Sequence, residues 1–350
     1  MPSLVFARHR RKLLAVVALL LRAILIATAL GAAGCSDSKQ DDPYKNFSPE
    51  GRALMETKNL TTEQKQKLKL VEIDYAKAPP EMRAIAHKIF LGQTPTQQEL
   101  KALGGNIDKS FPTRKPNGLY RHGRTLLFTA VENHNLAAVD ALLAAGASPY
   151  VSIDPGNESA QVRAWNFIYL VLQEEGEQLP NEERFDKTYA NQLLELYLKN
   201  GGDANYRWPD GDTLLDATFG MNLDGFKILL KAGADPWVHD RNHDPLPVQL
   251  VLSGGYNAPR FIHYLAEQGY YDNIPGAYLQ EMMNAVTRKL DSGIRSDPNE
   301  MGKYYVQFAQ YADAIKLVLN RAHYSLPKDS ELYRLLYVDD HLYRKPTRGD

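Results

Sequence analysis

The stretch Asp210–Pro236, DGDTLLDATFGMNLDGFKILLKAGADP, decides how this chain is expected to fold. It contains a Gly-x-Thr turn and then two short apolar segments, each long enough for a short helix. Thr213 is expected to cap the first helix, and Gly233 stands where the second must end, in a left-handed conformation that favours glycine. The side chains expected to enter the core are Leu214, Leu215, Leu229 and Leu230.

Similar units occur on both sides of this stretch. Residues 123–130, GRTLLFTA, begin a second copy, which ends with LLAAGASP at residues 142–149. Further closing segments end at Gly104, Gly201 and Gly269. A single unit of this kind cannot bury its own apolar face, so neighbouring copies are needed to complete the core.

These motifs resemble the ankyrin-repeat family, whose period is about 33 residues. The intervals from Gly201 to Gly233 and from Gly233 to Gly269 are close to that period, whereas the two earlier intervals contain insertions. The resemblance covers residues 95–275. It implies an all-α ankyrin-repeat solenoid of about four or five helix-turn-helix repeats with short β-turn tips, between helical caps.

The rest of the chain is divided around these repeats. The expected segments are a lipoprotein signal peptide (1–34), a flexible tether (35–47), a helical N-terminal cap (48–103), ankyrin repeats (104–275), a helical C-terminal cap (276–343) and a disordered tail (344–350). Thr61 and Thr96 each begin a capping-box pattern in the N-terminal cap. Further helices are expected over residues 164–173, 189–198, 278–290, 304–320 and 330–343. The charged loop 174–187 is either a solvated insertion or an arm that contacts a partner.

The N-terminus has the features of an export signal. A basic segment precedes the apolar run Leu13–Ala33, which Arg22 interrupts. The following Cys35 resembles the lipidated cysteine of bacterial lipoproteins, although Ala32 stands where that family usually has leucine. Ser36 by the same resemblance favours the periplasmic side of the outer membrane over the inner membrane. An uncleaved anchor and an ordinary cleaved signal peptide are the alternatives.

Charge and cysteine content exclude several classes of function. The formal net charge is −1, but residues 1–34 contain Arg and Lys and no Asp or Glu, so the remaining chain is more acidic. Nucleic-acid binding requires a clustered positive surface and is not expected. Because Cys35 is the single cysteine, an intramolecular disulfide and a cysteine metal cluster are excluded.

The sequence lacks the common catalytic motifs, so we expect a protein that is not an enzyme and needs no cofactor. The strongest metal-like pattern is His239 and His243 with two nearby aspartates, at residues 239–244. This pattern falls in an expected turn, where a hydrogen-bonded hairpin explains it better than a metal site does.

A partner-binding surface is expected at the turn tips, because Trp, Tyr and Arg dominate interface hot spots. The alternative for Trp208 and Trp237 is that they pack between repeats as part of the core. The candidate binding residues are Tyr150, Tyr206, Arg207, Trp208, Asp210, Trp237, His239, Asp240, Arg241 and Tyr271.

The resemblance, combined with export and lipidation, implies a monomeric protein-binding lipoprotein of a Gram-negative envelope. Exported ankyrin proteins of this kind look like those encoded beside toxic secreted effectors, particularly type VI phospholipases, where they act as immunity proteins. The acidic chain suits an effector with a basic surface. A periplasmic scaffold that recruits an endogenous envelope enzyme is the alternative.

Overall fold

The chain is mainly helical wherever its structure can be described, as the sequence predicts. The computed structural model describes residues 47–57, 59–111, 113–114, 120–121, 123–151, 167, 187–208, 211–218, 222–238, 244–253, 257–295 and 305–339. The predicted signal peptide, nearly all of the tether and of helix 164–173, loop residues 174–186 and the tail lie outside these ranges. Within them, no helix is both long and apolar enough to cross a membrane.

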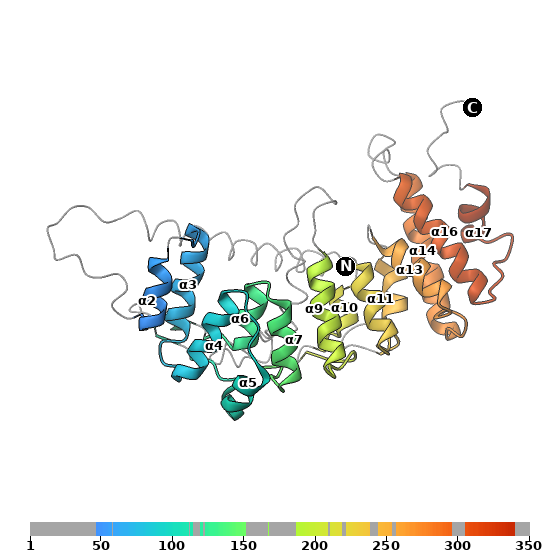
Figure 1. Ribbon diagram of the computed structural model, residues 1–350. Helices are drawn as coiled ribbons and strands as arrows, with labels where there is room; N and C mark the ends of the chain where they lie inside the picture. The colour runs from blue at the N-terminus through green and yellow to red at the C-terminus, as the bar shows by residue number, and fades with distance from the viewer. Residues whose placement is uncertain are drawn as a thin grey trace, which may run out of the picture. The chain divides into compact units, whose positions relative to one another are not determined.

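Figure 1 labels the elements in chain order, which comprise an N-terminal, a middle and a C-terminal group. The first contains α2 (Pro49–Glu56), α3 (Thr62–Asp74), α4 (Pro80–Phe90), α5 (Gln97–Leu103), the 3₁₀ turn η1 (Gly104–Asn106) and an unpredicted antiparallel ribbon of β1 (Thr113–Arg114) and β2 (Tyr120–Arg121). The second contains α6 (Leu126–Glu132), α7 (Leu136–Ala144), α9 (Lys187–Lys199), α10 (Leu214–Thr218), α11 (Leu223–Lys231), α12 (Leu246–Ser253) and α13 (Ala258–Glu267). The third contains α14 (Gly276–Arg295), α16 (Tyr305–Arg321), α17 (Glu331–Tyr333) and the π-helical turn η2 (Arg334–Val338).

Threonine hydroxyls cap four of these helices in the same way. Thr61, Thr96, Thr125 and Thr213 each accept a hydrogen bond from the backbone N–H three residues further on. Both predicted capping boxes, at Thr61 and Thr96, are complete. The predicted cap at Thr213 is also confirmed, and its own N–H is bonded by the Asp216 carboxylate at 2.8 Å. These bonds satisfy amide groups that the first helical turn leaves without partners.

Two buried asparagines cap the second helices of their pairs and also connect them to the preceding pair. Asn135 accepts the Ala138 N–H at the start of α7, and its Nδ2 donates to the Gln93 carbonyl at 2.9 Å. Asn222 accepts the Gly225 N–H at the start of α11, and its Nδ2 donates to Asn191 Oδ1 at 2.8 Å. At both places, therefore, an asparagine caps a helix and also bonds to the preceding part of the chain.

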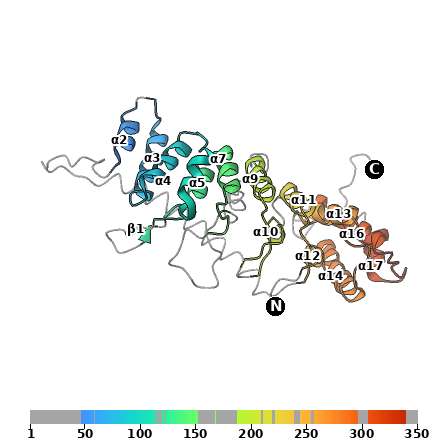
Figure 2. The same cartoon turned by 60° about the horizontal axis from the view of Figure 1, so that its bottom comes forward.

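The helices pack mainly on their neighbours along the chain. Three pairs of consecutive helices, α6–α7, α10–α11 and α12–α13, form in the middle group, and α9 packs between α7 and α11. Figures 1 and 2 show these helices following one another in chain order. At the two ends, α4 packs on α6 and α16 packs on α13. The end pairs consequently do not leave their apolar faces exposed to water.

The closing glycines have the conformation that the sequence predicts for Gly233. All five have a positive φ, between 50° and 92°, and they are Gly104, Gly146, Gly201, Gly233 and Gly269. An L-residue is strained in this region, so glycine is the residue that ends these helices at least cost.

One hydrophobic core runs through the described part of the chain from Val71 to Leu336. The four leucines predicted to enter it, Leu214, Leu215, Leu229 and Leu230, are all buried. The N-terminal helices are joined to the middle group by polar contacts as well. The hydroxyl of Tyr75, the residue that follows α3, lies 2.7 Å from Thr129 Oγ1 on α6, and both side chains are buried.

The last predicted helix differs from the structure. The sequence predicts a helix over residues 330–343, but the α-helix ends at Tyr333 and continues as a π-helical turn to Val338. The Asp339 N–H donates to the Arg334 carbonyl at 2.8 Å, a bond that widens the turn by one residue. The Asp339 carboxylate also accepts from Arg334 Nη1 at 2.8 Å, which stabilises this end. Residues 340–343 lie outside the described part.

Candidate functional site

Most of the candidate binding residues belong to the turns that follow the closing glycines. We call residues 146–150, 201–208, 233–238 and 269–272 the turn row; each of its segments starts at a closing glycine with positive φ. The backbone leaves the helix there and exposes short segments between one helix pair and the next. Side chains on such segments are available to a partner unless packing between turns buries them.

Successive turns are joined by one repeated hydrogen bond. The fifth residue of a turn accepts the N–H of the third residue of the next turn, as Asp108 Oδ1 does from Ser148 at 2.8 Å. Asn205 Oδ1 accepts the Asp235 N–H at 2.8 Å in the same way, and Asn205 Nδ2 donates to the Gly233 carbonyl at 3.1 Å. We call this contact the turn-to-turn bond. It joins the turns that start at Gly104, Gly146, Gly201 and Gly233, each to the next.

Tyr150 occupies the corresponding place in the second turn and makes the turn-to-turn bond with a phenol. Its hydroxyl lies 2.8 Å from the Tyr197 hydroxyl and 3.4 Å from the Asp203 nitrogen. Tyr197 uses its own proton to donate to the Asp203 carbonyl at 2.9 Å, so Tyr150 donates to Tyr197 and accepts the Asp203 N–H. Burial raises the pKa of the Tyr197 hydroxyl, which keeps the proton in place for this bond.

The Tyr150 ring is fixed by its neighbours and is also exposed to solvent. It stacks on the Tyr206 ring with centroids 4.8 Å apart, and Tyr206 meets the Trp208 ring edge-on at 5.7 Å. The exposed fraction of the residue decreases along these three rings, from 38% for Tyr150 to 2% for Trp208. An exposed aromatic ring that is already fixed loses little conformational entropy when a partner covers it.

Two candidate residues are too deeply buried to contact a partner. Trp208 packs against the core beneath Tyr206, which agrees with the alternative prediction for this residue. Tyr271 is fully buried, and its hydroxyl donates to the Pro247 carbonyl at 3.0 Å. Large aromatic rings next to a repeat interface gain more by filling it than by remaining in water, so the prediction of surface positions was wrong for both.

The remaining candidates divide into described and undescribed positions. Arg207 is exposed and pairs through its backbone with Thr213, which closes a short hairpin. Trp237 is half-buried, and its N–H donates to Asp235 Oδ1 at 2.9 Å. Four predicted site residues lie outside the described part of the chain: Asp210, His239, Asp240 and Arg241. The same holds for His243 of the metal-like pattern, while the described residues contain no cluster suited to a metal ion.

The role of Tyr197 was missed by sequence reasoning, although the repeats contain a signal for it. Tyr197 lies four residues before its closing glycine, where the other copies have Leu142 and Leu229. Gly202 follows the closing glycine, where those copies have alanine. A Cβ atom on Gly202 would lie 2.4 Å from the Tyr197 ring. The larger residue and the smaller residue compensate for each other in this one copy.

A second polar cluster lies in the first helices and is buried. Glu72 on α3 accepts the Ser48 N–H at 2.7 Å and the Ser48 hydroxyl at 2.9 Å, and it also pairs with His87 on α4. The carboxylate thus separates the serine from the histidine, an order unlike that of a nucleophile activated by a base. Burial raises the pKa of Glu72, but the bonds from His87 and Ser48 outweigh burial and leave that pKa below its usual value.

The lowered pKa of Glu72 predicts a loss of stability in acid. A carboxyl group with a depressed pKa stabilises the fold above its unfolded pKa, about 4.3, and this contribution disappears as the pH falls through the folded pKa. We therefore expect the difference in unfolding free energy between the protein and Glu72→Gln to be largest near pH 6 and to shrink towards pH 3. Denaturant titrations at several pH values measure this difference.

Glu63→Gln is the matched control, because Glu63 lies on the same helix, is exposed and pairs with Lys67 in water. Its effect on stability should be small at every pH. A difference for Glu72→Gln that stays constant from pH 6 to pH 3 would contradict the assigned role of the Glu72 carboxylate.

Comparisons of the chain with models of known protein families, with curated proteins and with solved structures found no match.

Proposed function

We propose that this chain is an ankyrin-repeat protein that binds a partner protein through its turn row and has no catalytic role. The five closing glycines, the threonine caps and the turn-to-turn bond support the repeat assignment. The observation that carries the binding role is Tyr150, an exposed ring fixed by stacking and by two hydrogen bonds. Rigid aromatic anchors of this type are typical hot spots of protein interfaces.

The partner we propose is a secreted toxic effector with a basic surface, such as a type VI phospholipase, which the protein neutralises in the periplasm. Lipidation at Cys35 and a location on the periplasmic side of the outer membrane belong to the same proposal. Charge on the turn row supports the choice of partner, since Asp203 and Asp235 are exposed there together with one arginine, Arg207, while Asp272 is paired with Arg321. Charge complementarity of this kind speeds association and disfavours acidic partners.

Substitution of Tyr150 by asparagine provides the sharpest test of this site. Asparagine already makes the turn-to-turn bond at position 205, so Tyr150→Asn removes the exposed ring while it retains a polar group at that place. We expect the affinity for the effector to fall about 30-fold or more, because truncation of a hot-spot residue costs about 2 kcal/mol or more. Isothermal titration of the purified pair measures this change.

The partner is first identified by crosslinking and capture from envelope extracts, followed by expression of each captured protein alone in the periplasm. An immunity function predicts one captured protein that is toxic alone and harmless when wild-type protein is present. Tyr337→Ala is the matched control, since Tyr337 is also an exposed tyrosine but lies outside the turn row. Equal protection by wild type and Tyr150→Asn would contradict the proposed site, and capture of several non-toxic endogenous proteins would favour a scaffold instead.

A further inference from the structure

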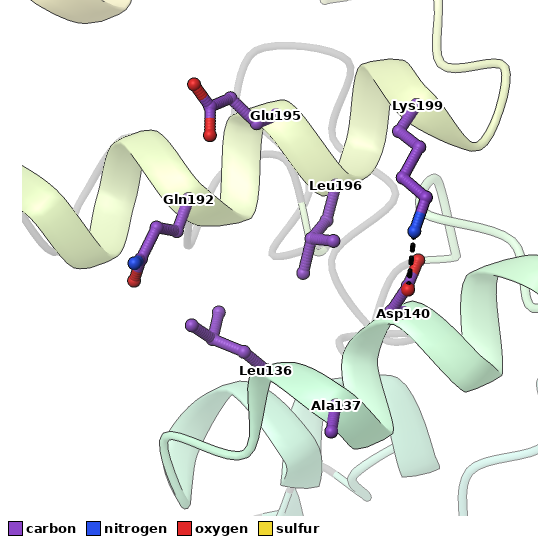
Figure 3. A pocket seen from close by; sticks show the side chains of 7 residues that line it. All are labelled: Leu136, Ala137, Asp140, Gln192, Glu195, Leu196 and Lys199. Carbon is purple, nitrogen blue, oxygen red and sulfur yellow. Dashed lines mark hydrogen bonds and ion pairs between the residues drawn. The ribbon is translucent and has the colours of Figure 1, made fainter.

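A groove separates α7 from α9 on a part of the surface that is distinct from the turn row. It has a volume of about 450 Å³, and Figure 3 shows the side chains around it. The residues that line it come from these two helices only: Leu136, Ala137, Asp140, Gln192, Glu195, Leu196 and Lys199. Its volume lies within the range of about 300–1,000 Å³ that is common for binding pockets.

The floor of the groove is apolar. Leu136 projects from α7 and Leu196 from α9 into the space between the helices (Figure 3). Both leucines pack against the core on one side and are only partly buried. The small side chain of Ala137 on α7 is exposed beside them and leaves the groove open. An apolar group placed between the leucines would remove their exposed surface from water, at about 25 cal/mol per Å².

An ion pair, in which the two opposite charges cancel, closes one end of the groove. Lys199 Nζ lies 2.6 Å from Asp140 Oδ2, and Asn200 Nδ2 donates to Asp140 Oδ1 at 2.9 Å. The hydrogen bonds from Lys199 and Asn200 lower the pKa of Asp140, which is therefore ionised and paired with the lysine. This end has no net charge to offer to a ligand.

The rim away from this ion pair carries a negative charge. Glu195 is exposed, and its carboxylate makes no hydrogen bond or ion pair with any residue in the described part of the chain. Gln192, one helical turn earlier, is also exposed, and its side-chain amide can both donate and accept hydrogen bonds. The groove thus combines an apolar floor with one carboxylate on its edge.

We propose that the α7–α9 groove is a docking site for a partner protein segment in which a large apolar side chain stands beside a lysine or arginine. The apolar side chain lies between Leu136 and Leu196, and the basic group pairs with Glu195. This is the arrangement in which an amphipathic segment is recognised in a groove between helices. The site is separate from Tyr150, so it can be occupied whether or not the turn row binds a partner.

A selection from random 12-residue peptides on the full immobilised chain tests this proposal without knowledge of the natural partner. Enriched peptides should contain leucine, phenylalanine or tryptophan next to lysine or arginine. Ala137→Trp, which fills the groove from an exposed position, should weaken the binding of these peptides at least 10-fold. Glu195→Lys, which reverses the charge on the rim, should weaken it about 5-fold and favour acidic peptides. Fluorescence anisotropy with labelled peptides measures the dissociation constants.

Ala144→Trp is the matched control, because Ala144 is exposed on the same helix and does not line the groove. This variant should bind the selected peptides as the wild type does, and it also tests whether α7 tolerates an added tryptophan. Three results would overturn the proposal: no enrichment of peptides, equal binding to wild type and Ala137→Trp, or enriched sequences without basic residues. Circular dichroism of each variant confirms that the helices are intact.

Discussion

Replacement of Arg124 by alanine should lower the free energy of unfolding by about 3–5 kcal/mol, the usual cost of breaking a buried ion pair by removal of one side chain. Arg124 bridges Asp74 on α3 and Glu132 on α6, and its Nη2 lies 2.9 Å from Glu132 Oε1. The Asp74 side chain is only 1% exposed, so water cannot replace the guanidinium there. Denaturant unfolding followed by circular dichroism measures the loss.

Lys199→Ala gives the comparison for this prediction. Its ion pair with Asp140 has a lysine that is 63% exposed, and pairs of this kind contribute about 0–1 kcal/mol. Each variant removes one positive charge, so the difference between their losses of unfolding free energy should come from burial. A loss below about 1 kcal/mol for Arg124→Ala would show that the first helices do not depend on this bridge.

Helix ends and repeat boundaries could be predicted from the sequence because local chemistry determines them. Thr61, Thr96 and Thr213 cap helices through their own backbone neighbours, and the closing glycines adopt a conformation that other residues avoid. None of these features depends on which residues meet across the fold. The sequence also placed the helix at 189–198 to within two residues of the observed Lys187–Lys199.

The candidate site was predicted less well, because burial between repeats depends on distant residues. Tyr150 and Trp237 both lie four residues after their closing glycines, yet Tyr150 is exposed and Trp237 is half-buried. The turn-to-turn bond joins residues that lie 30 positions apart for Asn205 and Asp235 and 53 apart for Tyr150 and Asp203. A pattern within one repeat contains no information about these partners.

The close packing of Gly202 and Tyr197 leads to the other large expected effect. Gly202→Ala should lower the free energy of unfolding by about 1–3 kcal/mol, the usual cost of overpacking. The new Cβ would lie 2.4 Å from the Tyr197 ring, which is 1% exposed and whose hydroxyl is bonded to the Asp203 carbonyl. Because the ring is buried and its hydroxyl is bonded, we expect the clash to displace the turn itself.

Tyr197→Leu should remove this penalty, because two other copies combine leucine at this place with alanine after the closing glycine, as Leu142 with Ala147 and Leu229 with Ala234. In the Tyr197→Leu protein, the further change Gly202→Ala should alter stability by less than about 0.5 kcal/mol. Additive effects in this double-mutant cycle would contradict the compensation between the two residues. The cycle also bears on binding, since the Tyr150 hydroxyl donates to Tyr197 and accepts the Asp203 N–H of the turn that Gly202→Ala displaces. Gly202→Ala should therefore also weaken binding of the partner protein, because it displaces the turn to which the Tyr150 hydroxyl is bonded.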